Sequence, residues 1–146
     1  MHLCGVTKNH RIGCGFNIVP MWHPLRLAED YAMVDILTGG RVIFGVGRGY
    51  HTREVESFGT PLIDQNANRE MFEEGVEVLF KAFAGRPFSN QGKYYTIPPE
   101  VPYYGYALKE ITLVQGRSGC RSNVGSRSRA APSVPSSSWR NTASAV

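Results

Sequence analysis

Arg48 is the residue of this sequence best placed to do chemistry, because it stands in a glycine-rich turn directly after an apolar run. The run is Val42–Val46, and the turn reads Gly47-Arg48-Gly49-Tyr50. Bare backbone N–H groups of such a turn can approach a phosphate, and a guanidinium can donate two parallel hydrogen bonds to it. The spacing therefore indicates an anion site. The alternative is that the glycines only permit a tight turn and that Arg48 is a solvated surface charge.

The segments before this turn have the pattern of a strand, a helix and a strand. Gly15–Val19 is a short apolar run, and Pro24–Leu37 has apolar residues at helical spacing, with Gly39 as its expected C′ residue. Val42–Val46 is apolar on both faces, as in a parallel strand that is covered on both sides. Anion sites of α/β folds lie at the carboxyl ends of such strands. We therefore expect the two strands to be parallel neighbours with the helix as their connection.

A second helix and a hairpin are expected further along the chain. Residues 52–66 show no regular pattern, and the helix is predicted from about Asn68, as its N-cap, to Ala84. Phe88–Thr96 resembles a hairpin with its turn near Asn90–Gly92. The predicted buried face of the helix consists of Phe72, Val76, Leu79, Phe80 and Phe83, and its glutamates, Glu70, Glu73, Glu74 and Glu77, are interpreted as a solvated face with a Glu77–Lys81 pair.

The remaining reactive residues give weaker signals. His51 follows the glycine turn and could contact a ligand, whereas His23, at a strand-to-helix junction, is expected to cap or pack. No spacing of histidine, cysteine or carboxylate indicates a metal site, and no nucleophile elbow is present. Three cysteines without a CxxC pair argue against a disulfide framework. Without a signal segment or a long apolar run, the expected location is cytoplasmic, with no membrane association.

Composition divides the chain near residue 115. Residues 117–146 contain five arginines, nine serines and no acidic residue, so they carry +5, and residues 1–116 carry −1 of the total of +4. Such a segment cannot bury enough apolar surface to offset its ordering entropy. We expect residues 116–146 to be a disordered Ser/Arg-rich basic tail that arises from a shift of reading frame near Gln115. Nucleic acid is not an expected partner, although the run Ser126–Arg129 leaves an arginine–serine RNA-binding segment as the alternative.

Several motifs in register resemble a known family. They are Ile12–Pro20, His23–Asp30, Asp35–Arg41, Phe44–Gly49 and Phe58–Gly59. In this order, over about residues 8–98, the chain resembles the bacterial luciferase-like family of flavin-dependent monooxygenases and coenzyme F420-dependent oxidoreductases. The resemblance implies a (β/α)8 TIM barrel, which usually needs about 250 residues. We therefore expect residues 1–115 to form a partial barrel, about its strands 3–4 with their helices, and the chain to be a fragment.

The resemblance also implies a cofactor, FMN or coenzyme F420, and assigns six residues to it. Gly15, Phe16 and Asn17 would border the flavin ring, and Arg48, Gly49 and Tyr50 match the loop that contacts the cofactor phosphate. The peptide Gly15–Phe16 is the expected position of a non-proline cis bond. Catalytic residues stay unassigned, because the histidine that serves some family members lies on an earlier strand. The cofactor carries the redox chemistry, while the protein supplies binding, orientation and water exclusion.

The expected function is that of a fragment of a flavin-dependent oxidoreductase or monooxygenase, inactive by itself. Its partners would be the flavin and an unidentified small-molecule substrate in the complete protein, with association through unpaired sheet edges. One alternative is a non-enzymatic product, either a truncated pseudo-enzyme or a basic-tailed binding protein. Another is a dinucleotide-binding fold. The spacing of Gly45, Gly47 and Gly49 argues against that fold, because a GxGxxG motif would need glycine where Tyr50 stands.

Overall fold

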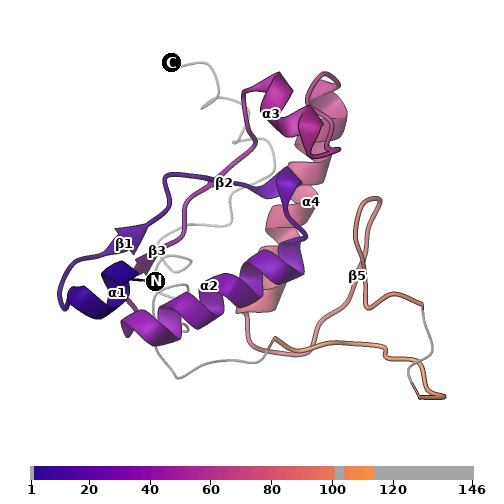
Figure 1. Ribbon diagram of the computed structural model, residues 1–146. Coiled ribbons are helices and arrows are strands. Elements are labelled where there is room, and N and C mark those ends of the chain that lie inside the picture. Colours follow the sequence, from indigo (N-terminus) through magenta and orange to yellow (C-terminus); the bar gives the residue numbers. More distant parts are fainter. Residues whose placement is uncertain (1, 101–103, 114–146) are drawn as a thin grey trace, which may run out of the picture.

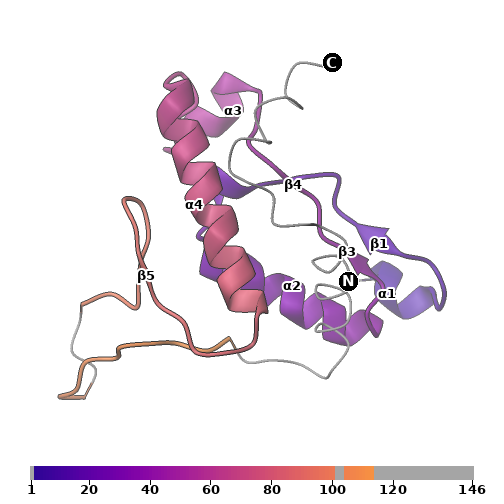
Figure 2. The ribbon, with the colours of Figure 1, turned by 180° about the vertical axis from the view of Figure 1, so that it is seen from behind.

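The computed structural model describes residues 2–100 and 104–113, which form a mixed α/β structure. Two long helices, α2 (Pro24–Thr38) and α4 (Gln65–Phe83), cross beside two extended segments that carry four short strands (Figure 1). The short helices α1 (His2–Val6) and α3 (Thr52–Ser57) lie at opposite ends of these segments (Figures 1 and 2). The predicted disordered tail, residues 116–146, and the predicted frame shift near Gln115 lie outside the described residues.

The two extended segments run parallel to each other. The first contains β1 (Ile12–Gly13) and β2 (Asn17–Ile18), and the second contains β3 (Val42–Ile43) and β4 (Val46–Gly47). β1 pairs with β3, and β2 pairs with β4. Helix α2 is the connection between the two segments. The prediction of two parallel strands joined by a helix is therefore confirmed.

A β-bulge interrupts both segments at the same level. Three residues separate the paired residues Gly13 and Asn17 on the first segment, whereas two separate Ile43 and Val46 on the second. The first segment therefore carries one extra residue within 14–16. The predicted strand Val42–Val46 is divided into β3 and β4, and the predicted strand Gly15–Val19 is shortened to β2, with β1 before it. Gly45 faces the bulge, and a Cβ atom there would lie 2.8 Å from the Cys14 carbonyl oxygen. Only glycine permits this approach of the two backbones.

Helix α2 has its predicted start and end. Pro24 occupies the first helical position, where its missing N–H needs no partner. Gly39 follows Thr38 in the left-handed conformation, with φ of 65°. The Gly40 N–H then donates to the Asp35 carbonyl at 2.9 Å. The helix therefore ends at a glycine C′ residue, as the sequence predicts.

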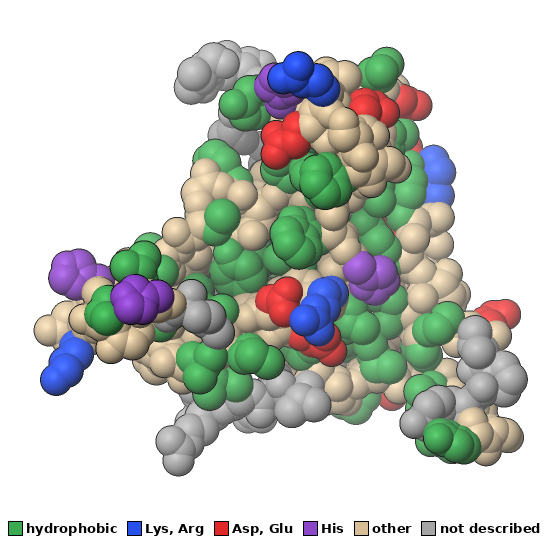
Figure 3. Space-filling model, in the orientation of Figure 1, with side chains coloured by type: hydrophobic (Ala, Val, Ile, Leu, Met, Phe, Trp, Pro, Cys, Tyr) green, Lys and Arg blue, Asp and Glu red, His purple; other side chains and the backbone are tan. Residues whose placement is uncertain are grey.

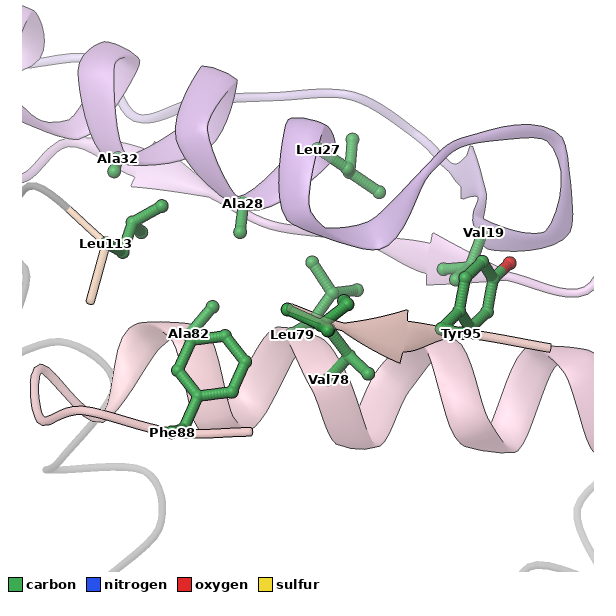
Figure 4. Close-up of a cluster of buried hydrophobic side chains, with 11 residues drawn as sticks. Val19, Leu27, Ala28, Ala32, Val78, Leu79, Ala82, Phe88, Tyr95 and Leu113 are labelled. Atoms are coloured by element: carbon green, nitrogen blue, oxygen red, sulfur yellow. The ribbon is translucent and has the colours of Figure 1, made fainter. Parts of the chain in front are cut away.

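The hydrophobic core lies between α2 and α4 (Figure 4). Small side chains on α2 allow the two helices to approach closely, and the hairpin and the segment near Leu113 close the cluster at its sides. Burying each large aliphatic side chain contributes about 1.5–3 kcal/mol. The buried residues of the core are Leu27, Ala28 and Ala32 from α2, Val78, Leu79 and Ala82 from α4, and Val19, Phe88, Tyr95, Ile97 and Leu113 from the surrounding segments.

Helix α4 starts earlier than predicted and presents a different face to the core. Asp64, rather than Asn68, is the N-cap, and its carboxylate accepts hydrogen bonds from the N–H groups of Asn66 and Ala67, both at 3.0 Å. Phe80 is 62% exposed, so its predicted burial is wrong. The apolar residues of α4 cover a broad part of the helix surface. Packing against α2 buries only one side of this surface and leaves Phe80, on the other side, exposed to solvent. Helix α3 was not expected either, because six residues are too few to show a period.

The predicted hairpin is present and is fastened to α4. Its strands, β5 (Asn90–Gln91) and β6 (Thr96–Ile97), are antiparallel. The turn therefore comprises residues 92–95, and its predicted position near Asn90–Gly92 is wrong, because Asn90 and Gln91 belong to the first strand. The Glu74 carboxylate accepts hydrogen bonds from the backbone N–H groups of Tyr94 and Tyr95, at 3.0 and 2.8 Å. The interpretation of Glu74 as part of a solvated face is therefore wrong. The predicted Glu77–Lys81 pair is present at 2.9 Å.

Candidate functional site

Arg48 lies immediately beyond the carboxyl ends of a parallel strand pair. Ile18 pairs with Gly47, and Arg48 is the next residue of the chain. One terminal nitrogen of its guanidinium, Nη2, donates to the Gln65 side-chain oxygen, Oε1, at 3.0 Å. Within residues 2–100 and 104–113 no Asp or Glu forms an ion pair with Arg48. A half-buried cation with a neutral partner is thus placed where the sequence predicts an anion site.

Gly49 determines the path of the turn after Arg48. Its φ of 83° lies in the left-handed region, which side chains other than hydrogen disfavour. A Cβ atom at Gly49 would also lie 2.7 Å from Val55 Cγ2 and 3.0 Å from Ile18 Cγ2. Tyr50 follows with 92% of its surface exposed. The turn therefore presents backbone, a guanidinium and an exposed ring at one end of the strand pair.

Gly15 and Phe16 lie on the bulge, and Asn17 begins β2. Phe16 is 72% exposed, whereas the Asn17 side chain is buried. Its amide nitrogen, Nδ2, donates to the Gly45 carbonyl at 2.8 Å and to the Tyr31 hydroxyl at 2.7 Å. The fold thus uses both the side chain and the backbone N–H of Asn17, because the N–H donates to the same Gly45 carbonyl at 2.9 Å.

The peptide bond between Gly15 and Phe16 is trans. In the described part of the chain the cis peptide bond is Ile97–Pro98. The expected cis bond at Gly15–Phe16 is therefore wrong for this structure.

The two groups of predicted site residues lie at different levels of one strand pair. Asn17 pairs with Val46, so Phe16 is level with Gly45, three residues before Arg48. At about 3.3 Å per residue, the bulge and the arginine are roughly 10 Å apart along the strands. The structure therefore places the six predicted cofactor-binding residues on or next to one pair of parallel strands, β2 and β4, but in two separate groups.

Comparison with known proteins identifies the family. Residues 2–106 match the family model described as luciferase-like monooxygenase. The chain belongs to this family. The resemblance predicted from the sequence motifs is thereby confirmed, and the match covers well over half of the chain.

Two relatives that the chain matches are much longer than the chain itself. It is 33% identical over 98 residues to the uncharacterized protein y4vJ of Sinorhizobium fredii, covering 67% of this chain and 27% of the relative. It is 30% identical over 96 residues to the oxygenase component of the flavin-dependent trigonelline monooxygenase of Acinetobacter baylyi, covering 66% and 26%. The chain therefore spans about a quarter of the length of these relatives.

A solved structure shares the fold. The oxygenating constituent of 3,6-diketocamphane monooxygenase from Pseudomonas putida, solved in complex with FMN, superposes with a TM-score of 0.63 and 23% identity. The similarity covers 81% of this chain and 32% of that chain. At this level of identity the likeness concerns the fold.

Two residues that contact Arg48, and a third that holds the loop before one of them, were not found from the sequence of this luciferase-like chain. Gln65 contacts the guanidinium, and the Asn68 amide nitrogen, Nδ2, lies 3.4 Å from the Arg48 carbonyl oxygen. Glu56 accepts hydrogen bonds from the backbone N–H groups of Leu62 and Ile63, and these bonds lower the pKa of its carboxyl group. Gln65 and Asn68 are three residues apart, which places them on one helix face. The predicted helix start at Asn68 obscured this signal.

The two other candidate residues, His51 and His23, have different surroundings, and the His51 ring lies 6.3 Å from the ring of the preceding Tyr50. His51 lines a shallow hollow of about 460 Å³ with Arg53, Glu54 and Ser57. His23 packs, as predicted, with its ring edge-on to Tyr95 at a centroid distance of 5.7 Å. The described residues contain no group of three His, Cys, Asp or Glu that could hold a metal ion. No described helix is long and apolar enough to cross a membrane.

Proposed function

We propose that the chain belongs to a flavin-dependent monooxygenase and supplies about the third and fourth strands, with their helices, of a (β/α)8 barrel. In this proposal, Arg48 binds the phosphate of the cofactor. The observation that carries it is the parallel pair β2–β4, which ends at Arg48 and has α2 as its connection. The substrate and the full activity belong to a complete barrel, because the chain spans about a quarter of the relatives it matches.

The residues around Arg48 suit a phosphate. The guanidinium has the charge and the donor geometry that an anion requires. Its partner is the neutral Gln65, so its charge is not offset by a carboxylate of the described residues. Gly49 has no side chain to cover the backbone of the turn. These features fit a phosphate better than they fit a solvated surface cation.

The bulge suits the ring of the same cofactor. Gly15 has no neighbouring atom within 4 Å of a Cβ position, so its face is open. The separation of roughly 10 Å between the bulge and Arg48 is comparable with an extended ribityl chain between a flavin ring and its phosphate. We therefore assign the bulge backbone at Gly15 and Phe16 to the ring edge, with the Phe16 ring as a cover that excludes water and with Asn17 as the residue that anchors the bulge beside it.

FMN is the first candidate for this cofactor, because one relative is described as flavin-dependent and the structural neighbour was solved with FMN. Coenzyme F420 stays the alternative, since it also carries a phosphate. When bound, the reduced cofactor supplies the electrons for oxygenation or hydride transfer. The contribution of this chain is to bind and orient it. No proton-transfer role is assigned to any of its residues.

The test compares FMN with riboflavin, which lacks the phosphate. Each flavin, at fixed concentration, is titrated with the 146-residue chain and followed by fluorescence quenching. We expect FMN to bind more tightly than riboflavin, and Arg48→Ala to weaken FMN binding by about 10- to 100-fold, since each charge-assisted hydrogen bond contributes about 1.5–3 kcal/mol. Arg48→Lys should recover part of this loss, because lysine keeps the positive charge but cannot donate two parallel hydrogen bonds to the phosphate.

Arg86→Ala is the matched control. Arg86 is exposed and follows the end of α4, whereas Arg48 contacts the first turn of that helix, about 28 Å away at 1.5 Å per residue. The control variant should bind both flavins as the unmodified chain does. Equal binding of FMN and riboflavin by the unmodified chain, or equal losses for both ligands in Arg48→Ala, would show that Arg48 has no phosphate role.

A further inference from the structure

The first turn of α4 holds Arg48 from two directions. Gln65 accepts a hydrogen bond from the guanidinium at 3.0 Å, and Asn68 directs its amide nitrogen at the Arg48 carbonyl oxygen at 3.4 Å. Because the two residues are three positions apart on α4, they share one face of the helix. One helical turn therefore contacts both the side chain and the main chain of the arginine.

The Gln65 amide has a defined orientation. Its nitrogen, Nε2, donates to the Leu62 carbonyl, so its oxygen faces the guanidinium. An amide oxygen orients a guanidinium without neutralising it, whereas a carboxylate at the same place would form an ion pair. The identity of residue 65 therefore decides how much of the Arg48 charge is left for an anion.

The loop that orients Gln65 is itself held by α3. The Glu56 carboxylate accepts hydrogen bonds from the N–H groups of Leu62 and Ile63, both at 2.7 Å. Figures 1 and 2 show α3 beside the first turn of α4. A continuous series of hydrogen bonds thus leads from Glu56 through Leu62 and Gln65 to Arg48.

Asn68 is a fully buried polar residue of which one polar atom has a partner and the other has none among the described residues. Its residue surface is 0% exposed, and its side-chain oxygen finds no donor among the described residues. A buried acceptor without a partner destabilises a fold, which offsets what the one hydrogen bond of the same amide contributes. The contact between Asn68 and the Arg48 carbonyl offers a reason for the amide that stability does not.

We propose that Gln65 and Asn68 are positioning residues that fix Arg48 for a phosphate group while leaving its charge unpaired. This inference rests on the proposed function of Arg48 as the phosphate ligand. Gln65 fixes the plane of the guanidinium, and Asn68 fixes the backbone from which that side chain extends. The ligand class is a phosphomonoester such as that of FMN.

The ligand test uses the same titrations of the full chain with FMN and riboflavin. Gln65→Glu should abolish the preference for FMN, because the new carboxylate pairs with Arg48 and competes with the phosphate. Gln65→Leu, which removes the hydrogen bonds to Arg48 and to the Leu62 carbonyl without adding a charge, should reduce the preference by about three- to tenfold. Gln91→Glu, which adds the same charge at an exposed position of the hairpin, is the matched control and should leave the preference unchanged.

Asn68→Leu separates positioning from stability. The variant should leave the midpoint of urea unfolding nearly unchanged, because removal of the unpaired acceptor offsets the lost hydrogen bond to the Arg48 carbonyl, and it should still reduce the preference for FMN by about three- to tenfold. Loss of stability together with an unchanged preference for FMN would overturn the role of Asn68 in positioning.

A measurement without flavin tests the contact itself. NMR of the arginine side chains should show slow rotation of the Arg48 guanidinium in the free chain and faster rotation in Gln65→Leu. Equal rotation rates would overturn the role of Gln65.

The binding results also distinguish failure of this inference from failure of the proposed function. If the unmodified chain prefers FMN and Arg48→Ala loses that preference while Gln65→Glu keeps it, the positioning inference fails and the phosphate role stands. If the chain shows no preference for FMN, the proposed function fails.

Discussion

At the scale of single residues, Asn17 is a structural residue that stands beside a proposed ligand surface. Its amide joins the Gly45 carbonyl to the Tyr31 hydroxyl, so it connects the bulge to α2. Burial raises the pKa of that hydroxyl, while the hydrogen bond from Asn17 partly opposes the shift. Tyr31 therefore keeps its proton at neutral pH and can act as a hydroxyl partner for Asn17.

Replacing Asn17 should destabilise the protein more than replacing its partner. Asn17→Ala loses both hydrogen bonds and leaves the Gly45 carbonyl with one donor, the Asn17 N–H, so we expect a loss of about 1–3 kcal/mol. Tyr31→Phe loses one bond and should cost about 0.5–1.5 kcal/mol. Urea unfolding of both variants measures the difference. Equal stability of Asn17→Ala and the unmodified chain would show that the bulge does not depend on this side chain.

Gly49 and Gly15, the two glycines of the proposed site, should differ in their tolerance of a side chain. Gly49→Ala should destabilise the fold by about 1–2 kcal/mol from the left-handed backbone alone, and by more because its Cβ would collide with Val55. Gly15→Ala should stay within about 0.5 kcal/mol, because nothing lies within 4 Å of its Cβ position. Thermal unfolding of the pair tests this contrast. Equal losses would mean that the two turns are under the same constraint.

At the scale of elements, α3 and the loop after it depend on one ionised carboxylate. The N–H groups of Ile63 and Leu62 bind the charged form of Glu56 and lower its pKa below the ordinary value of 4.5. A lowered pKa in the folded state means that this stabilisation is present above pH 4.5 and is lost as the pH falls through the lowered value.

Glu56→Gln should therefore reduce stability most near neutral pH. Its difference from the unmodified chain in the free energy of unfolding should shrink below pH 4.5, where the native carboxyl group becomes protonated as well. Glu54→Gln, an exposed change on the same helix, is the control. Urea unfolding between pH 7 and pH 3 measures the effect, and a difference that is constant over this range would contradict it.

The sequence predicted the elements whose signals are local. Helix α2 has a proline at its start, a glycine after its end and a periodic apolar face between them, and each of these acts within a few residues. The bulge could not be predicted, because it arises from the contact of Gly45 with the Cys14 carbonyl on the neighbouring strand. The same holds for the site. The turn signal located Arg48, but Gln65 reaches it only because α4 packs across the end of the strand pair.

At the scale of the whole molecule, the described residues leave much apolar surface and several strand edges open. Each of the pairs β1–β3 and β2–β4 contains two strands within these residues, so each has two edges without a further strand. Phe16, Phe58 and Phe80 are each more than half exposed. On the face drawn in Figure 3, hydrophobic side chains reach the surface over a broad area, and Lys and Arg are scattered among them.

These features predict how the 146-residue chain behaves in solution. Unpaired edges and exposed aromatic rings favour contacts between copies, so we expect light scattering to report masses above 16.2 kDa at micromolar concentration. We also expect flavin binding to be weak, so that it is seen in an equilibrium titration while the purified chain retains well below one flavin per chain. The strand pair supplies one arginine and one ring edge, whereas a flavin site in a barrel draws on several strands.

Turnover with NAD(P)H or reduced F420 should be absent, because a site open on several sides can neither enclose a reduced flavin nor exclude water from it.

Size-exclusion chromatography with light scattering, followed by absorbance near 450 nm on the same fractions, tests association and flavin binding together. Substitution of Phe80 by serine should lower the associated mass if exposed apolar surface drives association, and the exposed Ser89→Ala change serves as its control. A monomer of 16.2 kDa that carries one flavin per chain and turns over would contradict the prediction, and would mean that these residues form a complete site by themselves.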